Sequence, residues 1–187
     1  ISFKSIFFGY DKKKSIISNL NLTINKGETI GFIGKSGSGK TTLFNILLGF
    51  LYPSEGQILI DDVSLDKRNI NKWRNNIGYV QQDVFLFDGS LKENILFGSD
   101  FAPEQNSRLQ EAIIKANLQE LVDSFDQGID EQLGERGAKI SGGQRQRVGI
   151  ARAIYSGSNV LIFDEATSAL DNETESEITE AIHSLSK

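Results

Sequence analysis

The chain has 187 residues, 39% of them hydrophobic and 24% charged, which is the balance of an ordinary globular domain with a core of its own. The net charge of −5 argues against a nucleic-acid-binding surface, and the absence of cysteine excludes disulfides and thiolate metal sites. No apolar run has the length that is needed to span a bilayer, so membrane association is expected to come through a partner or further sequence. The chain lacks methionine and starts at Ile1, and we expect it to be part of a longer protein.

Residues that favour β-strands dominate the first part of the chain. Ile1 to Phe8 alternates between apolar and polar residues, and Ile16 to Ile24 predicts a second strand. The polar stretch from Asp11 to Ser15 lies between them and predicts a hairpin loop, and Lys26 to Glu28 predicts a turn. These elements predict an antiparallel β subdomain at the start of the chain.

A strand, a glycine-rich loop and a helix follow in the next segment. Thr29 to Ile33 predicts a short apolar strand, Gly34 to Gly39 the loop, and Thr42 to Gly49 the helix. Two more strands are predicted over Gln57 to Ile60 and Ile77 to Val80.

Helical patterns dominate the rest of the chain. We predict one helix that starts at Phe101 to Glu104 and continues through Leu109 to Ala116, and a second from Ser141 to Ile154. Val160 to Phe163 is a continuous apolar run, which is typical of a strand buried on both faces, and Glu173 to Leu185 predicts a last helix. Strands that alternate with helices predict an α/β fold with a mainly parallel sheet.

The strongest local pattern is a phosphate-binding loop of the form G-x-x-x-x-G-K-[ST]. Its members are Gly34, Lys35, Ser36, Gly37, Ser38, Gly39, Lys40 and Thr41, with Thr42 next in the helix. Glycines let backbone N–H groups surround a phosphate, and the helix adds its positive N-terminal end. Lys40 is expected to reach the β- and γ-phosphates, and the Thr41 hydroxyl is expected to bind Mg²⁺.

Two carboxylates follow the buried strand that ends at Phe163. Ligand sites of open α/β sheets lie at the carboxyl ends of the strands, so Asp164 and Glu165 are candidates for the same site. Asp164 can hold Mg²⁺, and Glu165 can orient and deprotonate an attacking water. Together with the phosphate loop, this pair predicts a nucleoside triphosphatase of the phosphate-loop class.

A third motif identifies the kind of triphosphatase. The segment from Leu133 to Gln144 contains Ser141, Gly142, Gly143 and Gln144 at a helix start, where a hydroxyl, bare N–H groups and the helix dipole can bind a second anion. This segment resembles the signature region of ABC ATPases. The resemblance implies that Ser141 to Gln144 contact the γ-phosphate of ATP held by a second copy of the domain.

Other segments resemble further parts of the same family in the same order. Tyr10 resembles the aromatic residue that stacks on adenine, and Gln82 resembles the glutamine that reaches Mg²⁺ and the attacking water. Gln81 is the alternative. Gln82 is preferred because Asp83 to Phe87 then align with the residues that follow this glutamine in the family. Ser168 to Asp171 resembles the loop that crosses to the partner subunit.

The resemblance covers nearly the whole chain and implies a phosphate-loop NTPase fold. We expect 1–187 to be a single ATPase domain, with the β subdomain and core at about 1–82, an inserted helical subdomain at about 83–145 and the core continued at about 146–187. The family carries a histidine near the γ-phosphate beyond the last predicted helix. His183 lies inside that helix, and we expect the chain to stop before the family's histidine.

Two segments favour the exporter branch of the family. Leu86 to Ile95 resembles the exporter pattern after the glutamine, and Gly134 to Gly137 resembles the exporter segment that touches the intracellular ends of transmembrane helices. The resemblance implies ATP and Mg²⁺ as cofactors, and a transmembrane domain and a second ATPase domain as partners. It places the protein on the cytoplasmic face of the inner membrane and leaves the cargo open.

Two other functions, an ABC ATPase that acts on DNA or ribosomes and a nucleotide sensor, fit the sequence less well. An ABC ATPase that acts on DNA or ribosomes would need coiled-coil insertions, paired ATPase domains or basic arms, and the chain shows none. A nucleotide sensor that does not hydrolyse ATP would lack the carboxylate at Glu165, which is present. The sequence therefore favours an ATP-hydrolysing domain of an exporter.

Overall fold

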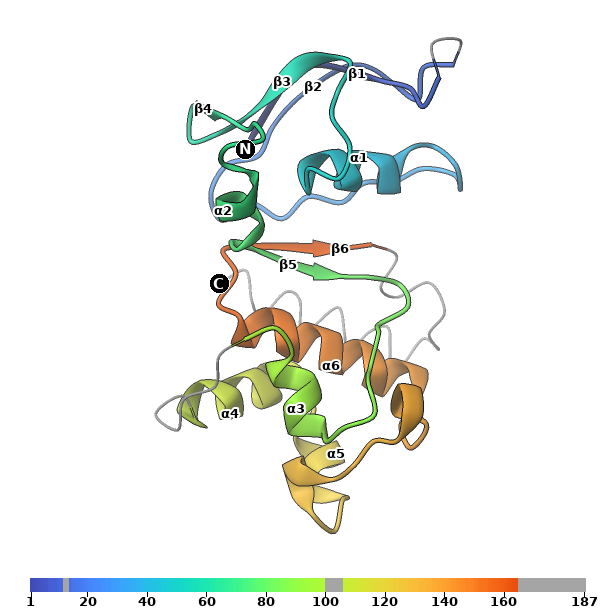
Figure 1. Cartoon of the computed structure of the whole chain (residues 1–187), viewed down its shortest axis with the longest axis vertical. Helices are drawn as coiled ribbons and strands as arrows, with labels where there is room; N and C mark the ends of the chain where they lie inside the picture. Colours follow the sequence, from blue (N-terminus) through green and yellow to red (C-terminus); the bar gives the residue numbers. More distant parts are fainter. Residues whose placement is uncertain (12–13, 100–105, 165–187) are drawn as a thin grey trace. The chain divides into compact units, whose positions relative to one another are not determined.

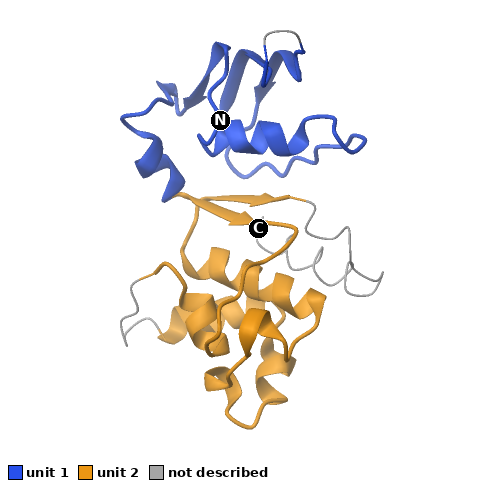
Figure 2. Cartoon of the chain, turned by 45° about the vertical axis from the view of Figure 1, so that its right-hand side comes forward, with its two compact units in different colours: residues 1–75, 186 blue, residues 76–185, 187 orange. Residues whose placement is uncertain are grey.

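The computed structural model describes residues 1–11, 14–99 and 106–164 of the chain. These residues form two compact units, the first over 1–75 and the second from 76 onward (Figure 2). Within the described ranges, no helix is both long and apolar enough to cross a membrane. The predicted last helix, with His183, and the predicted helix start at Phe101 to Glu104 lie outside the described residues.

The first unit is built on an antiparallel sheet with the strand order β2-β1-β3-β4 (Figure 1). The strands are β1 (Ser2–Phe8), β2 (Ile17–Thr23), β3 (Glu55–Ile60) and β4 (Val63–Ser64). Phe3 pairs with Leu22 on one side and with Ile58 on the other, and the Phe3 side chain is buried. The predicted N-terminal hairpin and the strand near Gln57 to Ile60 are thus confirmed.

Two helices accompany this sheet, α1 (Lys40–Leu47) and α2 (Ile70–Arg74). Trp73 of α2 donates its indole N–H to the carbonyl of Leu47 over 2.8 Å, and Arg74 Nε donates to the carbonyl of Leu48 over 2.8 Å. The last carbonyls of a helix have no partner inside the helix. α2 therefore caps the C-terminal end of α1, so that α1 is anchored at the end opposite the glycine-rich loop.

The strand predicted over Thr29 to Ile33 does not form. Residues 29–35 are irregular, and the Ile33 side chain is fully exposed. A strand exists only where a neighbour completes its hydrogen-bond ladder, and none of the described strands pairs with this segment. An apolar pattern alone does not supply the neighbouring strand, so the predicted strand is wrong.

The second unit combines a short parallel sheet with helices. β5 (Ile77–Val80) pairs in parallel with β6 (Val160–Phe163). The described strands therefore form an antiparallel sheet at the start of the chain, as predicted, and a separate parallel sheet of two strands. The helices are α3 (Leu91–Leu96), α4 (Asn106–Lys115), α5 (Gln119–Asp123), the single 3-10 turns η2 (Gly128–Asp130) and η3 (Glu135–Gly137), and α6 (Gly142–Tyr155). The strands at Ile77 to Val80 and Val160 to Phe163 and the helix after Ser141 are confirmed.

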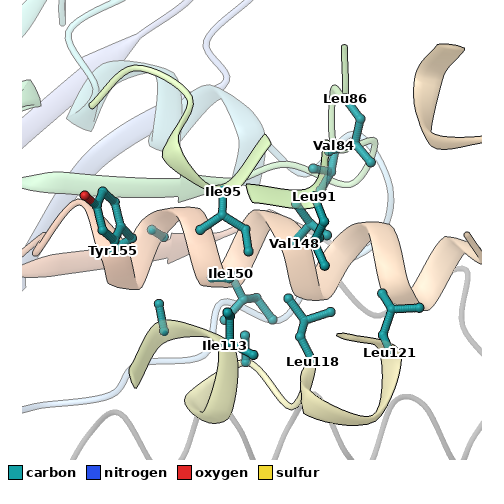
Figure 3. Packing of buried hydrophobic residues seen from close by; sticks show 14 of the residues in the cluster. Val84, Leu86, Leu91, Ile95, Ile113, Leu118, Leu121, Val148, Ile150 and Tyr155 are labelled. Carbon is teal, nitrogen blue, oxygen red and sulfur yellow. The ribbon is translucent and has the colours of Figure 1, made fainter. Parts of the chain in front are cut away.

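Helix α6 is the centre of this unit, because it contacts α3 and α4 as well as β5 (Figure 3). Its buried face carries Val148, Ile150 and Tyr155, and the surrounding cluster includes Ile95 and Ile113. Two glycines bring α6 close to β5. A Cβ atom at Gly78 would lie 2.7 Å from the Cβ of Ala153. A Cβ atom at Gly149 would lie 3.4 Å from Val80 Cγ1 in β5 and 2.9 Å from Val84 Cγ2 in the segment that follows.

We predict that Gly149→Ala destabilises the protein although alanine favours helices. The gain in helix propensity is about 0.8–1 kcal/mol, whereas overpacking a filled core costs about 1–3 kcal/mol. Gly142→Ala is the matched control, since a Cβ there meets no atom closer than 3.8 Å. Urea unfolding should show a lower midpoint for Gly149→Ala only, and equal midpoints for both variants would contradict this close packing.

Candidate functional site

The glycine-rich loop of the first unit presents its backbone to solvent. Lys35, Ser36, Gly37 and Ser38 are exposed. Gly37 has φ 78° and Gly39 has φ 97°, a region of backbone conformation that other residues rarely adopt. Glycine at positions 37 and 39 is therefore favoured by the backbone.

The loop runs directly into α1, whose N-terminal end is open. The residue that precedes α1, Gly39, has no side chain to cap the helix, and no acidic residue occupies the first turn. Lys40 Nζ donates to the carbonyl of Gly34 over 3.0 Å and to that of Lys35 over 3.4 Å, so the ammonium group lies over the loop. Exposed N–H groups, a positive helix end and an ammonium group fit a phosphate chain.

Tyr10 lies next to this loop–helix junction. Its hydroxyl is 3.4 Å from Thr42 Oγ1 in the first turn of α1, and its ring contacts Phe8 edge-on with 5.2 Å between the centroids. The side chain is 65% exposed, so a face of the ring is accessible. The structure thus brings together Tyr10, Thr42 and the phosphate loop, with Thr41 exposed beside them.

In the second unit, Asp164 directly follows the parallel strands. Val80 pairs with Phe163, and the Asp164 N–H continues the ladder by donating to the Val80 carbonyl over 3.0 Å. The Asp164 side chain is 8% exposed, and its Oδ2 accepts the hydroxyl of Tyr79 over 3.1 Å. Burial, followed by the negative charge of Asp164, raises the pKa of Tyr79 to about 12, so this hydroxyl keeps its proton.

Gln82 lies in the segment that leaves β5. Its side chain is exposed, and its carbonyl accepts the amide N–H of Gln146 over 3.3 Å. The Gln81 side chain hydrogen-bonds with the Tyr79 hydroxyl. The preference for Gln82 over Gln81 as the residue that reaches Mg²⁺ stays a prediction.

Ser141 precedes α6 and caps it. The Gln144 N–H donates to Ser141 Oγ over 3.2 Å, and the Ser141 N–H donates to Gln144 Oε1 over 2.8 Å, which is a complete capping box. Ser141 and Gly142 are exposed, whereas Gly143 is buried. The cap leaves the hydroxyl proton of Ser141 available to an anion, together with the dipole of a 14-residue helix.

The three residues predicted to bind Mg²⁺ are divided between the units. Thr41 belongs to the first unit, and Gln82 and Asp164 belong to the second. Hydroxyl, amide and carboxylate oxygens fit Mg²⁺, which typically takes one or two carboxylates together with substrate phosphates. Among the described residues, no group of three or more acidic or histidine side chains is placed to hold a metal ion. Glu165 and the Ser168 to Asp171 segment lie outside the described residues.

Two polar residues near these groups were missed from the sequence. The sequence predicts only a strand at Tyr79. The signal that could have identified it is the two-residue spacing from Gln81, which places both side chains on one face of an extended chain. Gln146 is 4% exposed, and its Oε1 has no hydrogen-bond partner among the described residues. A polar residue on the buried face of a helix is the signal that could have identified Gln146.

Comparison with known proteins gives one consistent family. The sequence model described as ABC transporter matches residues 17–168. The chain is 46% identical over 187 residues to the uncharacterized ABC transporter ATP-binding protein YwjA of Bacillus subtilis, covering 100% of this chain and 32% of that protein. It is 44% identical over 172 residues to the ATP-dependent lipid A-core flippase of Bordetella avium, covering 92% of this chain and 29% of that protein.

A solved structure agrees with these relatives. A bacterial Atm1-family ABC exporter with ATP bound matches 100% of this chain with a TM-score of 0.88 and 35% sequence identity. The match covers 32% of the exporter chain. The present chain thus spans about a third of the length of the curated relatives that it matches.

Proposed function

This chain belongs to the ABC transporter family as an ATP-binding, ATP-hydrolysing domain of the exporter type, and we propose that it powers export across a membrane within a longer protein. The observation that carries the proposal is the exposed phosphate loop, which lies under Lys40 and opens onto the uncapped start of α1. In this proposal the chain acts on the cytoplasmic face of the inner membrane. The division into parts at about 1–82, 83–145 and 146–187 is proposed with it.

The phosphate loop and Tyr10 would hold ATP. The residues proposed to contact the nucleotide in this half of the site are Tyr10, Gly34, Lys35, Ser36, Gly37, Ser38, Gly39, Lys40, Thr41 and Thr42. The exposed ring of Tyr10 can stack on the base, because its hydroxyl is tied to the first turn of the helix that receives the phosphates.

Mg²⁺ would be held by Thr41, Gln82 and Asp164. When bound, the ion neutralises charge on the phosphate oxygens. Glu165 is proposed to orient and deprotonate the attacking water, and Gln82 to position it. The Gln82 carbonyl also accepts a hydrogen bond from Gln146 of α6. A movement of Gln82 on nucleotide binding would therefore be transmitted to the helices of the second unit.

Two copies of the domain are proposed to bind ATP together. Each chain carries two helix starts suited to anions, one at Lys40 and one at Ser141, and a symmetric head-to-tail pair would use each Ser141 to Gln144 segment on the nucleotide of the other copy. The capping box supports this arrangement, since it fixes the helix start before the ligand arrives.

An aromatic cluster of the second unit is proposed to receive the transmembrane domain. Phe85 and Phe97 are 60% and 50% exposed, and the Phe97 ring lies 6.3 Å from that of Phe85 and 5.5 Å from that of Phe87, between centroids. Arg152 of α6 holds two members of the cluster. Its guanidinium lies 5.1 Å from the centroid of the Phe97 ring, and its Nη2 donates to the Phe85 carbonyl over 3.2 Å.

The second predicted contact segment adjoins this cluster. The Leu133 N–H donates to the Gly89 carbonyl over 3.0 Å, and a Cβ at Gly137 would lie 2.6 Å from Leu86 Cδ1. Glu135, between them, is exposed. The two segments that resemble the exporter branch therefore pack against each other, which supports the proposal of a single docking site for the intracellular ends of transmembrane helices.

We predict that Lys40→Ala weakens ATP binding. Loss of a hydrogen bond to a charged group costs about 1.5–3 kcal/mol, which corresponds to roughly 10–150-fold in Kd. Lys26→Ala, on an exposed turn of the same unit, is the matched control. Calorimetry with Mg-ATP should separate the two variants, and equal affinities would refute the role of Lys40.

We predict that two inactive variants restore ATPase activity when mixed. Lys40→Ala disables the phosphate loop and Ser141→Arg blocks the second anion site, so either variant alone has two damaged sites. In a head-to-tail pair formed from one copy of each, one site combines the intact Lys40 with the intact Ser141. The mixture should reach a substantial fraction of the wild-type rate, whereas a mixture as inactive as its components would argue against shared sites.

We predict that Phe97→Ala uncouples the domain from its transmembrane partner in the full-length protein. Removing an exposed ring should leave ATP affinity unchanged, because the ring is not part of the nucleotide site, while transport-stimulated hydrolysis should fall several-fold. Ile114→Ala is the control, since Ile114 is 60% exposed, against 50% for Phe97, and lies on α4 of the same unit. Equal stimulation in both variants would exclude the aromatic cluster as the docking surface.

A further inference from the structure

The face of the parallel sheet opposite α6 carries two polar side chains. Gly78 faces α6, as its contact with Ala153 shows, and side chains alternate along a strand, so Tyr79 lies on the opposite face. Tyr79 pairs with Ile162, and Asp164 lies two residues beyond Ile162. Tyr79 and Asp164 therefore share one face of two hydrogen-bonded strands.

The backbone holds these side chains in register. The Asp164 N–H donates to the Val80 carbonyl over 3.0 Å, which extends the ladder by one residue past the last pair. The Tyr79 hydroxyl then reaches Asp164 Oδ2 over 3.1 Å, between residues 85 positions apart in the sequence. A rigid aromatic ring on a paired strand can move little, so the hydrogen bond limits the rotation of the carboxylate.

We propose that Tyr79 is a positioning residue for Asp164, whose carboxylate it orients for a divalent cation that accompanies the nucleotide. The inference rests on the proposed role of Asp164 in binding Mg²⁺. Partners that hydrogen-bond to metal ligands fix the orientation of the ligand, and their loss typically costs about 10–100-fold in metal affinity or activity. A carboxylate that is 8% exposed has few water molecules to replace the lost hydroxyl.

Tyr79→Phe tests the proposal, because it removes only the hydroxyl. Binding of Mn²⁺ to the purified protein with saturating ADP is measured by electron paramagnetic resonance, which does not depend on turnover. We expect Mn²⁺ affinity to fall about 10–100-fold. Binding of ADP without metal should stay as in the wild type. Tyr155→Phe, which removes a hydroxyl from α6 of the same unit, should change neither quantity.

The variant Asp164→Asn, and the double variant that combines it with Tyr79→Phe, separate this inference from the proposed function. If Tyr79 acts through Asp164, the double variant should bind Mn²⁺ no more weakly than Asp164→Asn alone. Two outcomes would overturn the inference and leave the role of Asp164 intact. One is that the losses of Mn²⁺ affinity in the two single variants add in the double variant. The other is that Tyr79→Phe keeps the wild-type Mn²⁺ affinity while Asp164→Asn clearly loses affinity. Wild-type affinity in Asp164→Asn would overturn both.

A purely structural role for Tyr79 predicts a different result. The loss of one hydrogen bond would lower the melting temperature of Tyr79→Phe without changing its affinity for Mn²⁺. Thermal melts of the metal-free variants therefore accompany the binding measurements. A lower melting temperature with unchanged Mn²⁺ affinity would reduce Tyr79 to a stabilising residue and refute the proposal.

Discussion

The close contact between α6 and β5 is the constraint on which the second unit depends. Gly78 and Gly149 remove the side chains that would separate the helix from the strand, so that α6 rests directly on the parallel sheet. The end of β5 leads to Gln82, the end of β6 leads to Asp164, and the start of α6 is capped by Ser141. A shift of α6 along β5 would therefore move Ser141 relative to Gln82 and Asp164, which both extend from the paired strands. A tightly packed core allows few intermediate positions of the helix.

In the first unit, the important feature is that the N-terminal end of α1 carries no side-chain cap. A side-chain cap at Gly39 would stabilise α1, but it would occupy the N–H groups that an anion needs. The chain instead secures the other end of α1, where Trp73 and Arg74 bind its last carbonyls. α1 is thus stabilised at its C-terminal end, and the glycine-rich loop at its other end stays exposed.

Local motifs were predictable from the sequence, and contacts that depend on distant partners were not. The positive φ angles of Gly37 and Gly39 and the cap at Ser141 follow from residues within a few positions of each other. The predicted strand at Thr29 to Ile33 was wrong because a strand needs a neighbour, which its own residues do not specify. The contact between Tyr79 and Asp164 was missed because it requires the register of two strands 85 residues apart. The roles of Glu165 and Gln82 depend on a ligand and stay predictions.

The structural and the functional interpretations of Ser141 prove to be compatible. A helix cap alone would explain its hydrogen bonds with Gln144, and an anion site alone would explain the glycines beside it. The hydroxyl accepts from the Gln144 N–H through its oxygen and still has a proton to donate, so one side chain can stabilise the helix and contact a phosphate. The cap fixes the position of the hydroxyl oxygen in advance, which lowers the entropy lost when an anion binds. If two copies of the chain share each nucleotide, each copy would bring an ordered Ser141 helix start to the nucleotide held by the other. Association of the two copies would then depend on the nucleotide and would need little further ordering of this segment.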